Sequence, residues 1–149
     1  MSLTLVLVPL SIAAAAATQG RRARRADVGS SHEMRVESRM RDETLLVVSL
    51  QDLGATVRRA DDGALLVDTA GGGLTMRRDA AGLWNACFTG EWRPEGARAL
   101  VESLDRAYGL RVQQAVIRRL EERAPAAGMR ISSQSIDDDR VVTLVMEVE

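Results

Sequence analysis

The sequence predicts an α+β domain in which two helices pack on one face of a single antiparallel sheet. Two observations favour this fold class. Residues 42–53 and 94–123 each carry aliphatic residues at helical spacing, and the other apolar runs are short and separated by tight-turn residues. The expected order of elements is β-α-β-β-β-β-α-β-β, with an additional apolar helix at the N-terminus. The simplest packing hides both helical stripes against one sheet.

The first twenty residues are apolar and uncharged, and three interpretations of them stay open. A membrane anchor with its N-terminus outside would be held by the basic cluster that follows, close to anionic headgroups. A cleaved signal peptide would use the alanines at 15–17 as its small-residue site, but it would lack a basic N-terminal region. The third interpretation is a soluble extension, or a true start at Met34. The basic cluster consists of Arg21, Arg22, Arg24 and Arg25.

The anchor is the favoured interpretation, and it sets the expected domain organisation. Residues 1–20 are then an apolar segment, residues 21–30 a basic linker and residues 31–149 a single α+β domain. Because arginines resist translocation, the domain is expected on the cytoplasmic side, attached to the inner face of the membrane.

The domain opens with a strand and a helix. Residues 34–40 alternate between apolar or small and charged side chains, which is typical of a half-buried strand. Asp42 is a good N-cap, since its carboxylate can accept the free N–H groups of the first helical turn. Leu46 and Leu50 lie on one helical face, and Gly54 follows at the position of a left-handed C-terminal cap.

Four short strands follow, near residues 55–60, 64–70, 74–78 and 83–89. Turn residues separate them at 61–63, 71–73 and 79–82, which predicts an antiparallel meander.

A long helix and a closing hairpin complete the predicted domain. Pro94 suits the first helical turn, and one apolar stripe continues from Ala97 to Leu120. Pro125 and Gly128 end the helix near residue 123. Residues 129–136 and 141–148 are the last two strands, joined across an acidic turn.

Composition excludes several classes of site. Residues 31–149 hold 16 arginines against 20 acidic residues, so a phosphate-neutralising surface on the domain is not expected. The chain has one cysteine, Cys87, and one histidine, His32. One chain therefore cannot form an internal disulfide or a Cys/His zinc site.

Residues 31–149 also resemble a known family. Its typical members open with Ser-His, an alternating strand and Arg-Asp, and then a helix that ends in Leu-Gly. The matching positions here are Ser31-His32, Arg41-Asp42, Leu45-Leu46 and Asp52-Leu53-Gly54, followed more loosely by Trp84, Tyr108 and Glu121-Glu122. The chain thus resembles the bacterial and plastid domain of unknown function first described as hypothetical chloroplast reading frame thirty-five. The resemblance implies an accessory role beside a AAA-type ATPase.

Three patterns could carry chemistry, and each is better explained structurally. The glycines at 71–73 could cradle a phosphate, but the Lys-Ser/Thr and helix of a P-loop do not follow. The aspartates at 137–139 are consecutive, so they point in different directions and favour a solvated turn over a Ca²⁺ or Mg²⁺ site. Cys87 would need His32 as its base to act as a nucleophile, and a buried inert thiol is the simpler interpretation.

A partner surface is the remaining candidate site. Trp92 is the aromatic residue most expected to be exposed, and arginines on the second half of the long helix suit an acidic partner. His32 is a further contact candidate at the domain edge. The arginines are Arg118, Arg119 and Arg123.

The sequence as a whole favours a non-catalytic accessory or adaptor domain, with no cofactor or metal, that is tethered to a membrane and binds a protein such as a AAA-type ATPase. The alternative is a small ligand-binding domain or enzyme that uses the sheet face near Cys87. A third hypothesis, nucleic-acid binding through the basic cluster at 21–25, would require a steep salt dependence of binding.

Overall fold

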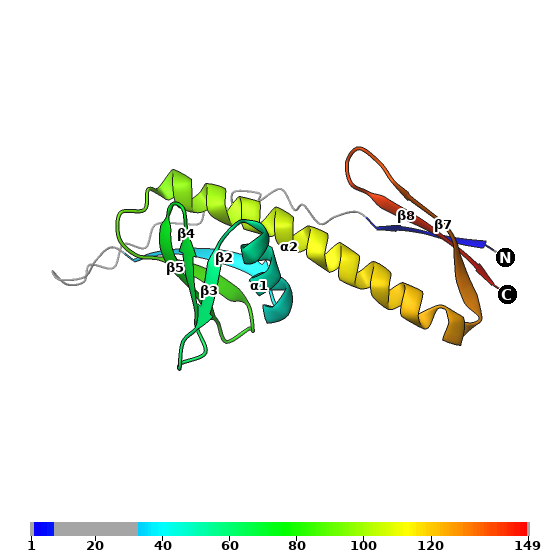
Figure 1. The fold of residues 1–149 in the computed structure, drawn as a ribbon, viewed down its shortest axis with the longest axis horizontal. Helices are drawn as coiled ribbons and strands as arrows, with labels where there is room; N and C mark the ends of the chain where they lie inside the picture. The colour runs from blue at the N-terminus through cyan, green and yellow to red at the C-terminus, as the bar shows by residue number, and fades with distance from the viewer. Residues whose placement is uncertain (1, 8–32, 149) are drawn as a thin grey trace. The chain divides into compact units, whose positions relative to one another are not determined.

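The computed structural model describes residues 2–7 and 33–148, and these form an α+β fold of two α-helices and two antiparallel sheets. The chain divides into two compact units (Figure 1). We call Ile12–Tyr108 the large unit, and Met1–Ser11 together with Gly109–Glu149 the small unit. Helix α2, Pro94–Arg123, contributes its first half to the large unit and its second half to the small unit.

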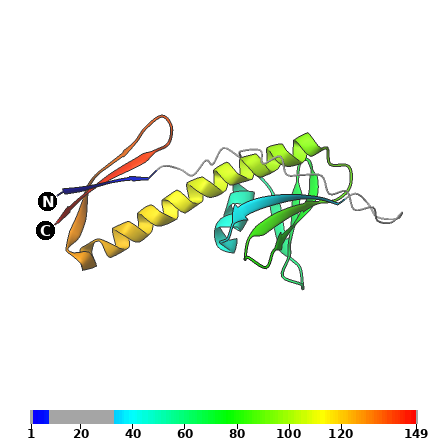
Figure 2. The ribbon, with the colours of Figure 1, turned by 180° about the vertical axis from the view of Figure 1, so that it is seen from behind.

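The large unit contains a five-stranded sheet with the strand order β2-β6-β5-β4-β3. Its strands are coloured from cyan to green in Figure 2. Every neighbouring pair is antiparallel, and consecutive strands from β3 to β6 are joined by tight turns, which confirms the predicted meander. The strands are β2 Met34–Met40, β3 Thr56–Arg59, β4 Leu65–Thr69, β5 Gly72–Arg78 and β6 Trp84–Phe88.

Helix α1, Glu43–Asp52, begins as its sequence predicts. The Asp42 carboxylate accepts a hydrogen bond from the backbone N–H of Leu45 at 2.9 Å, so it is the N-cap. Gly54 follows the helix with a φ of +79°, a left-handed conformation that glycine adopts without steric cost. Leu46 and Leu50 are completely buried, so this helix is held by packing as well as by its cap.

The core of the large unit is one buried cluster. It combines α1, the first half of α2 and one face of the sheet, as the two helical stripes predict. Trp84 and Phe88 on β6, which lies between β2 and β5, are at most 2% exposed, and Ala97 and Leu104 contribute from α2.

The small unit contains a second sheet, so the prediction of a single sheet is wrong. Its strand order is β1-β8-β7, with β1 Ser2–Leu7, β7 Met129–Ile136 and β8 Val142–Val148. The length of α2 explains the difference. Thirty residues extend about 45 Å, whereas five strands span only about 20 Å, so one sheet cannot cover the whole apolar stripe. The closing hairpin instead lies beside the second half of the helix, and the two line one groove.

The predicted N-terminal helix is also wrong for residues 2–7, which form strand β1 (blue in Figure 1). Leu3, Leu5 and Leu7 alternate with Thr4 and Val6, a period of two that suits a strand. The remainder of the apolar segment, the basic cluster at 21–25 and His32 lie outside the described residues. No helix in the described ranges is both long and apolar enough to cross a membrane.

Candidate functional site

A groove of about 550 Å³ lies in the small unit, between the second half of α2 and the β7–β8 hairpin. Its lining combines four aliphatic side chains with six polar or charged ones. The aliphatic residues are Leu110, Ile117, Ile136 and Val142, and the others are Gln113, Gln114, Arg118, Glu121, Gln134 and Arg140. A groove of this size and mixed lining is suited to a few side chains of a bound molecule.

The two walls follow from the periodicities of a helix and a strand. On α2 the lining residues recur every three or four positions from Leu110 to Glu121, so they form one stripe. On β7, Gln134 and Ile136 are two positions apart and therefore share a face. Ile136 pairs with Val142 across the hairpin and is 64% exposed. The groove therefore presents a large apolar side chain to solvent.

Gln113 organises the inner end of the groove. Its side chain is 9% exposed, and its amide Nε2 donates hydrogen bonds to the carbonyl oxygens of Leu7 at 3.1 Å and Arg140 at 3.0 Å. A buried amide is stable only when such partners satisfy it. Gln113 therefore fixes the ends of β1 and of the hairpin relative to the helix that forms the other wall.

The charges of the groove favour an anionic group. Arg118 and Arg140 carry two positive charges, against the single negative charge of Glu121. Guanidinium groups bind carboxylates through paired hydrogen bonds, so an acidic side chain is the complementary ligand group.

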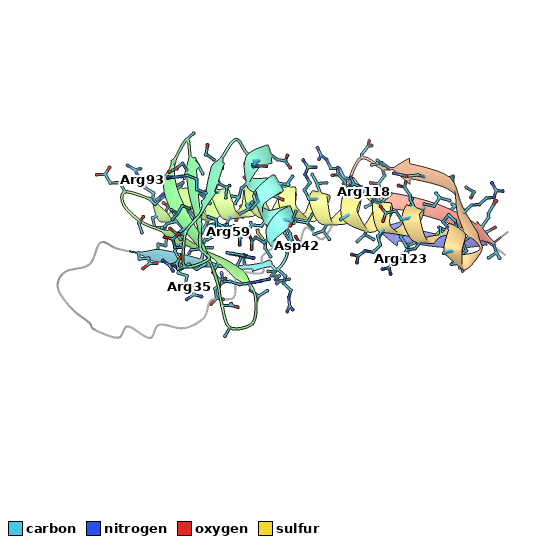
Figure 3. All side chains as sticks on the ribbon, turned by 60° about the horizontal axis from the view of Figure 1, so that its bottom comes forward. Arg35, Asp42, Arg59, Arg93, Arg118 and Arg123 are labelled. Carbon is cyan, nitrogen blue, oxygen red and sulfur yellow. The ribbon has the colours of Figure 1, made fainter. Side chains whose placement is uncertain are left out.

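The predicted partner arginines separate into two groups. Arg118 lines the groove, whereas Arg119 and Arg123 are exposed on the same helix and are not part of its lining. Figure 3 labels Arg118 and Arg123 on this half of α2. The helical rotation of about 100° per residue separates neighbours such as Arg118 and Arg119.

Trp92 is half-buried rather than exposed, and its indole is used within the fold. The ring packs edge-to-face on Phe88, with centroids 4.9 Å apart and planes at 69°. Its Nε1 donates a hydrogen bond to the carbonyl oxygen of Gly73 at 2.8 Å. These contacts give Trp92 a structural role at the β4–β5 turn.

The same indole explains two of the consecutive glycines. A Cβ on Gly71 would lie 3.0 Å from Cη2 of Trp92, and one on Gly72 would lie 3.1 Å from Nε1. Gly72 also has a φ of +130°, which side-chain-bearing residues rarely adopt. The turn is therefore glycine-rich because a tryptophan lies against it, which the sequence pattern does not reveal.

Cys87 lies on β6, opposite Arg35 of the adjacent strand β2. It is only 4% exposed, and burial raises the pKa of its thiol, with a further increase from the neighbouring Glu33 carboxylate. A nucleophilic cysteine needs a lowered pKa and an accessible thiolate. The surroundings of Cys87 therefore do not activate its thiol. His32, the base that a nucleophilic Cys87 would need, lies outside the described residues.

The acidic turn between β7 and β8 is closed by its own first residue. Asp137 Oδ1 accepts a hydrogen bond from the backbone N–H of Val141 at 2.9 Å, and the N–H of Arg140 donates to the Asp137 carbonyl at 3.0 Å. This carboxylate is thus used to form the turn. In the described part of the chain, no three His, Cys, Asp or Glu side chains gather as a metal-binding group.

Comparison with protein-family models, curated proteins and solved structures finds no match to this chain. The resemblance to the chloroplast reading-frame family therefore stays a prediction from the sequence.

Sequence reasoning identified Arg118 but missed the rest of the groove. Gln113 was the available signal, because it is a polar residue between Leu110 and Ile117 on one face of α2. The exposure of Ile136 was not predictable, since its strand pattern does not show which side chains the helix covers.

Proposed function

We propose that this chain is a non-catalytic adaptor that binds a protein partner in the groove of the small unit. One observation carries the proposal. Four aliphatic side chains gather in the groove, and one of them, Ile136, is 64% exposed, the largest exposed fraction of any large apolar residue in the described part of the chain. Soluble proteins rarely concentrate apolar exposure in this way unless the surface is used.

The occupant that fits this groove is a short segment of another protein with apolar side chains and an acidic residue. Leu110, Ile117 and Ile136 would contact the apolar side chains. Arg118 and Arg140 would bind the carboxylate, and the exposed glutamines Gln114 and Gln134 can bond the backbone of an extended segment. The family resemblance makes a AAA-type ATPase the first partner to test with purified components.

Attachment to the inner face of a membrane is a separate prediction from the sequence. Residues 8–20 lie outside the described ranges, and Ser2–Leu7 are already paired with β8. The adaptor proposal does not depend on the tether.

Site-specific photo-crosslinking in cells tests the groove. A benzoylphenylalanine introduced at Gln134, which lines the groove, is expected to crosslink one partner reproducibly. The same group at Ser132 is the control, because this exposed residue of β7 is outside the lining. Equal crosslinking from both positions, or none from Gln134, would contradict the proposal.

Arg118 and Arg119 provide a matched pair of charge variants with which to test the binding of the captured partner. Arg118→Glu should weaken its binding at least about tenfold, since reversing a charge that faces a carboxylate replaces attraction by repulsion. Arg119→Glu makes the same change in net charge outside the groove and should alter binding much less. Similar effects of the two variants would show that only the net charge of the surface matters.

A further inference from the structure

Strand β1 is an edge strand, and it differs from the other sheet edges. The sheet orders place β1 and β7 at the edges of the small sheet, and β2 and β3 at the edges of the large one. An edge strand has N–H and C=O groups that can pair with another chain, and natural proteins usually block such pairing with charges, irregularities or short strands.

The other three edges carry these blocking features. Strand β2 has charged residues at alternate positions and a register shift between Val36 and Met40. Strand β3 has only four residues, of which Arg58 and Arg59 are charged. Strand β7 contains an arginine and a register shift between Ile131 and Ser133.

Strand β1 has none of them. Its six residues, SLTLVL, are uncharged and contain no proline. They pair with β8 in one unbroken register, from Ser2 opposite Glu147 to Leu7 opposite Val142. Leu3 is 59% exposed and Val6 is 53% exposed. Among the described residues, only β8 pairs with this strand.

We infer that β1 pairs antiparallel with β1 of a second copy of this chain. The strand is compatible with a two-fold axis at Leu5, because Leu3 then lies opposite Leu7 of the other copy and Thr4 lies opposite Val6. An antiparallel pair aligns residues of the same face, so the leucines of both strands form one apolar ladder. Each three-stranded sheet becomes half of a continuous six-stranded sheet.

A second copy suits this edge better than a foreign strand for two reasons. The pattern is its own complement in the antiparallel direction, which a two-fold interface requires. The absence of charge also means that no like charges oppose each other when identical strands meet. A contact of six residues per copy is small, so a concentration-dependent dimer is expected rather than a permanent one. This inference does not depend on the groove.

Two double variants test the register. Thr4 and Val6 are exposed, and they face each other across the proposed axis. Thr4→Lys with Val6→Glu places opposite charges at both of these contacts, whereas Thr4→Lys with Val6→Lys places like charges there. The two variants differ at one residue, so both place two charged side chains on the same face of the strand, and they differ in the sign of one charge.

Sedimentation velocity of the full chain over a concentration series provides the readout. The unmodified chain and the Lys/Glu variant are expected to dimerise, and the Lys/Lys variant is expected to require at least tenfold higher concentration. A monomeric unmodified chain at all concentrations would overturn the inference. So would equal association of the two variants, or loss of the dimer in both.

Discussion

The phenolic oxygen of Tyr108 accepts a hydrogen bond from the backbone N–H of Asp42 at 3.0 Å. It also accepts one from the N–H of Arg41 at 3.2 Å. These bonds join the beginning of α1 to α2, and Arg78 adds a third contact by donating to the Arg41 carbonyl at 2.9 Å. The Arg41-Asp42 pair, which is recognisable in the sequence, therefore marks the junction at which both helices meet the sheet.

The Tyr108→Phe variant tests this junction. Phenylalanine keeps the ring but removes the acceptor of both hydrogen bonds, so a loss of about 1 kcal/mol in the free energy of unfolding is expected. Urea denaturation followed by circular dichroism measures it. Stability equal to that of the unmodified chain would mean that water replaces the hydroxyl without cost.

The glycines of the β4–β5 turn should differ in their tolerance of alanine. Gly71→Ala places a methyl group 3.0 Å from the Trp92 ring and is expected to cost about 1–3 kcal/mol of stability. Gly73→Ala is the control, because its nearest contact is the Asp68 carboxylate at an ordinary 3.6 Å. Urea denaturation of both variants gives the comparison, and equal costs would refute the role assigned to Trp92.

Asp79 is expected to contribute to acid sensitivity. A hydrogen bond from the Leu83 N–H lowers the pKa of its carboxyl group below the ordinary 3.8, with further bonds from the Asn85 amide and the Ala81 N–H. Because the folded pKa is below the unfolded one, this stabilisation is present above the unfolded pKa and is lost as pH falls through the folded pKa.

The Asp79→Asn variant should therefore lose less stability than the unmodified chain as the pH falls below about 4. Thermal melts across this range measure the slope of stability against pH. Asp61→Asn is the control, since the described residues include no hydrogen-bond partner for that carboxylate. Parallel pH profiles for the unmodified chain and the Asp79 variant would contradict the prediction.

Removing the first 33 residues tests the assignment of β1. A chain that begins at Met34 lacks the strand that pairs with β8, and Gln113 loses its bond to the Leu7 carbonyl. Backbone amides of Val142–Val148 should then exchange hydrogen faster. Exchange in Trp84–Phe88 of the large unit serves as the internal control and should be unchanged. Unaltered exchange in β8 would show that β1 does not belong to this sheet.

Local signals in the sequence predicted much of the large unit. Asp42 and Gly54 delimit α1 through cap chemistry, and the turn residues mark the hairpins between β3 and β6. The end of the long helix at Arg123 was also predicted, from Pro125 and Gly128. These features depend on nearby residues, so a single sequence contains them.

Features that depend on distant residues were not predictable. Leu3–Leu7 is apolar enough for a helix and also alternates as a strand does, and its pairing with β8, more than 130 residues away, decides in favour of the strand. The division into two sheets follows from how much of α2 one sheet can cover. The apolar stripe of the helix does not show this length. The groove is lined by α2 and by the β7–β8 hairpin of the second sheet, and only one of its residues, Arg118, was among the predicted contacts.

Hydrogen exchange tests the adaptor proposal most directly. It is measured on the full chain alone and on the full chain bound to the partner that crosslinking at position 134 captures. Slower exchange is expected in residues 110–121 of α2 and 134–142 of the hairpin, with Trp84–Phe88 of β6 unchanged. Slower exchange on the large sheet, with the groove segments unaffected, would contradict it.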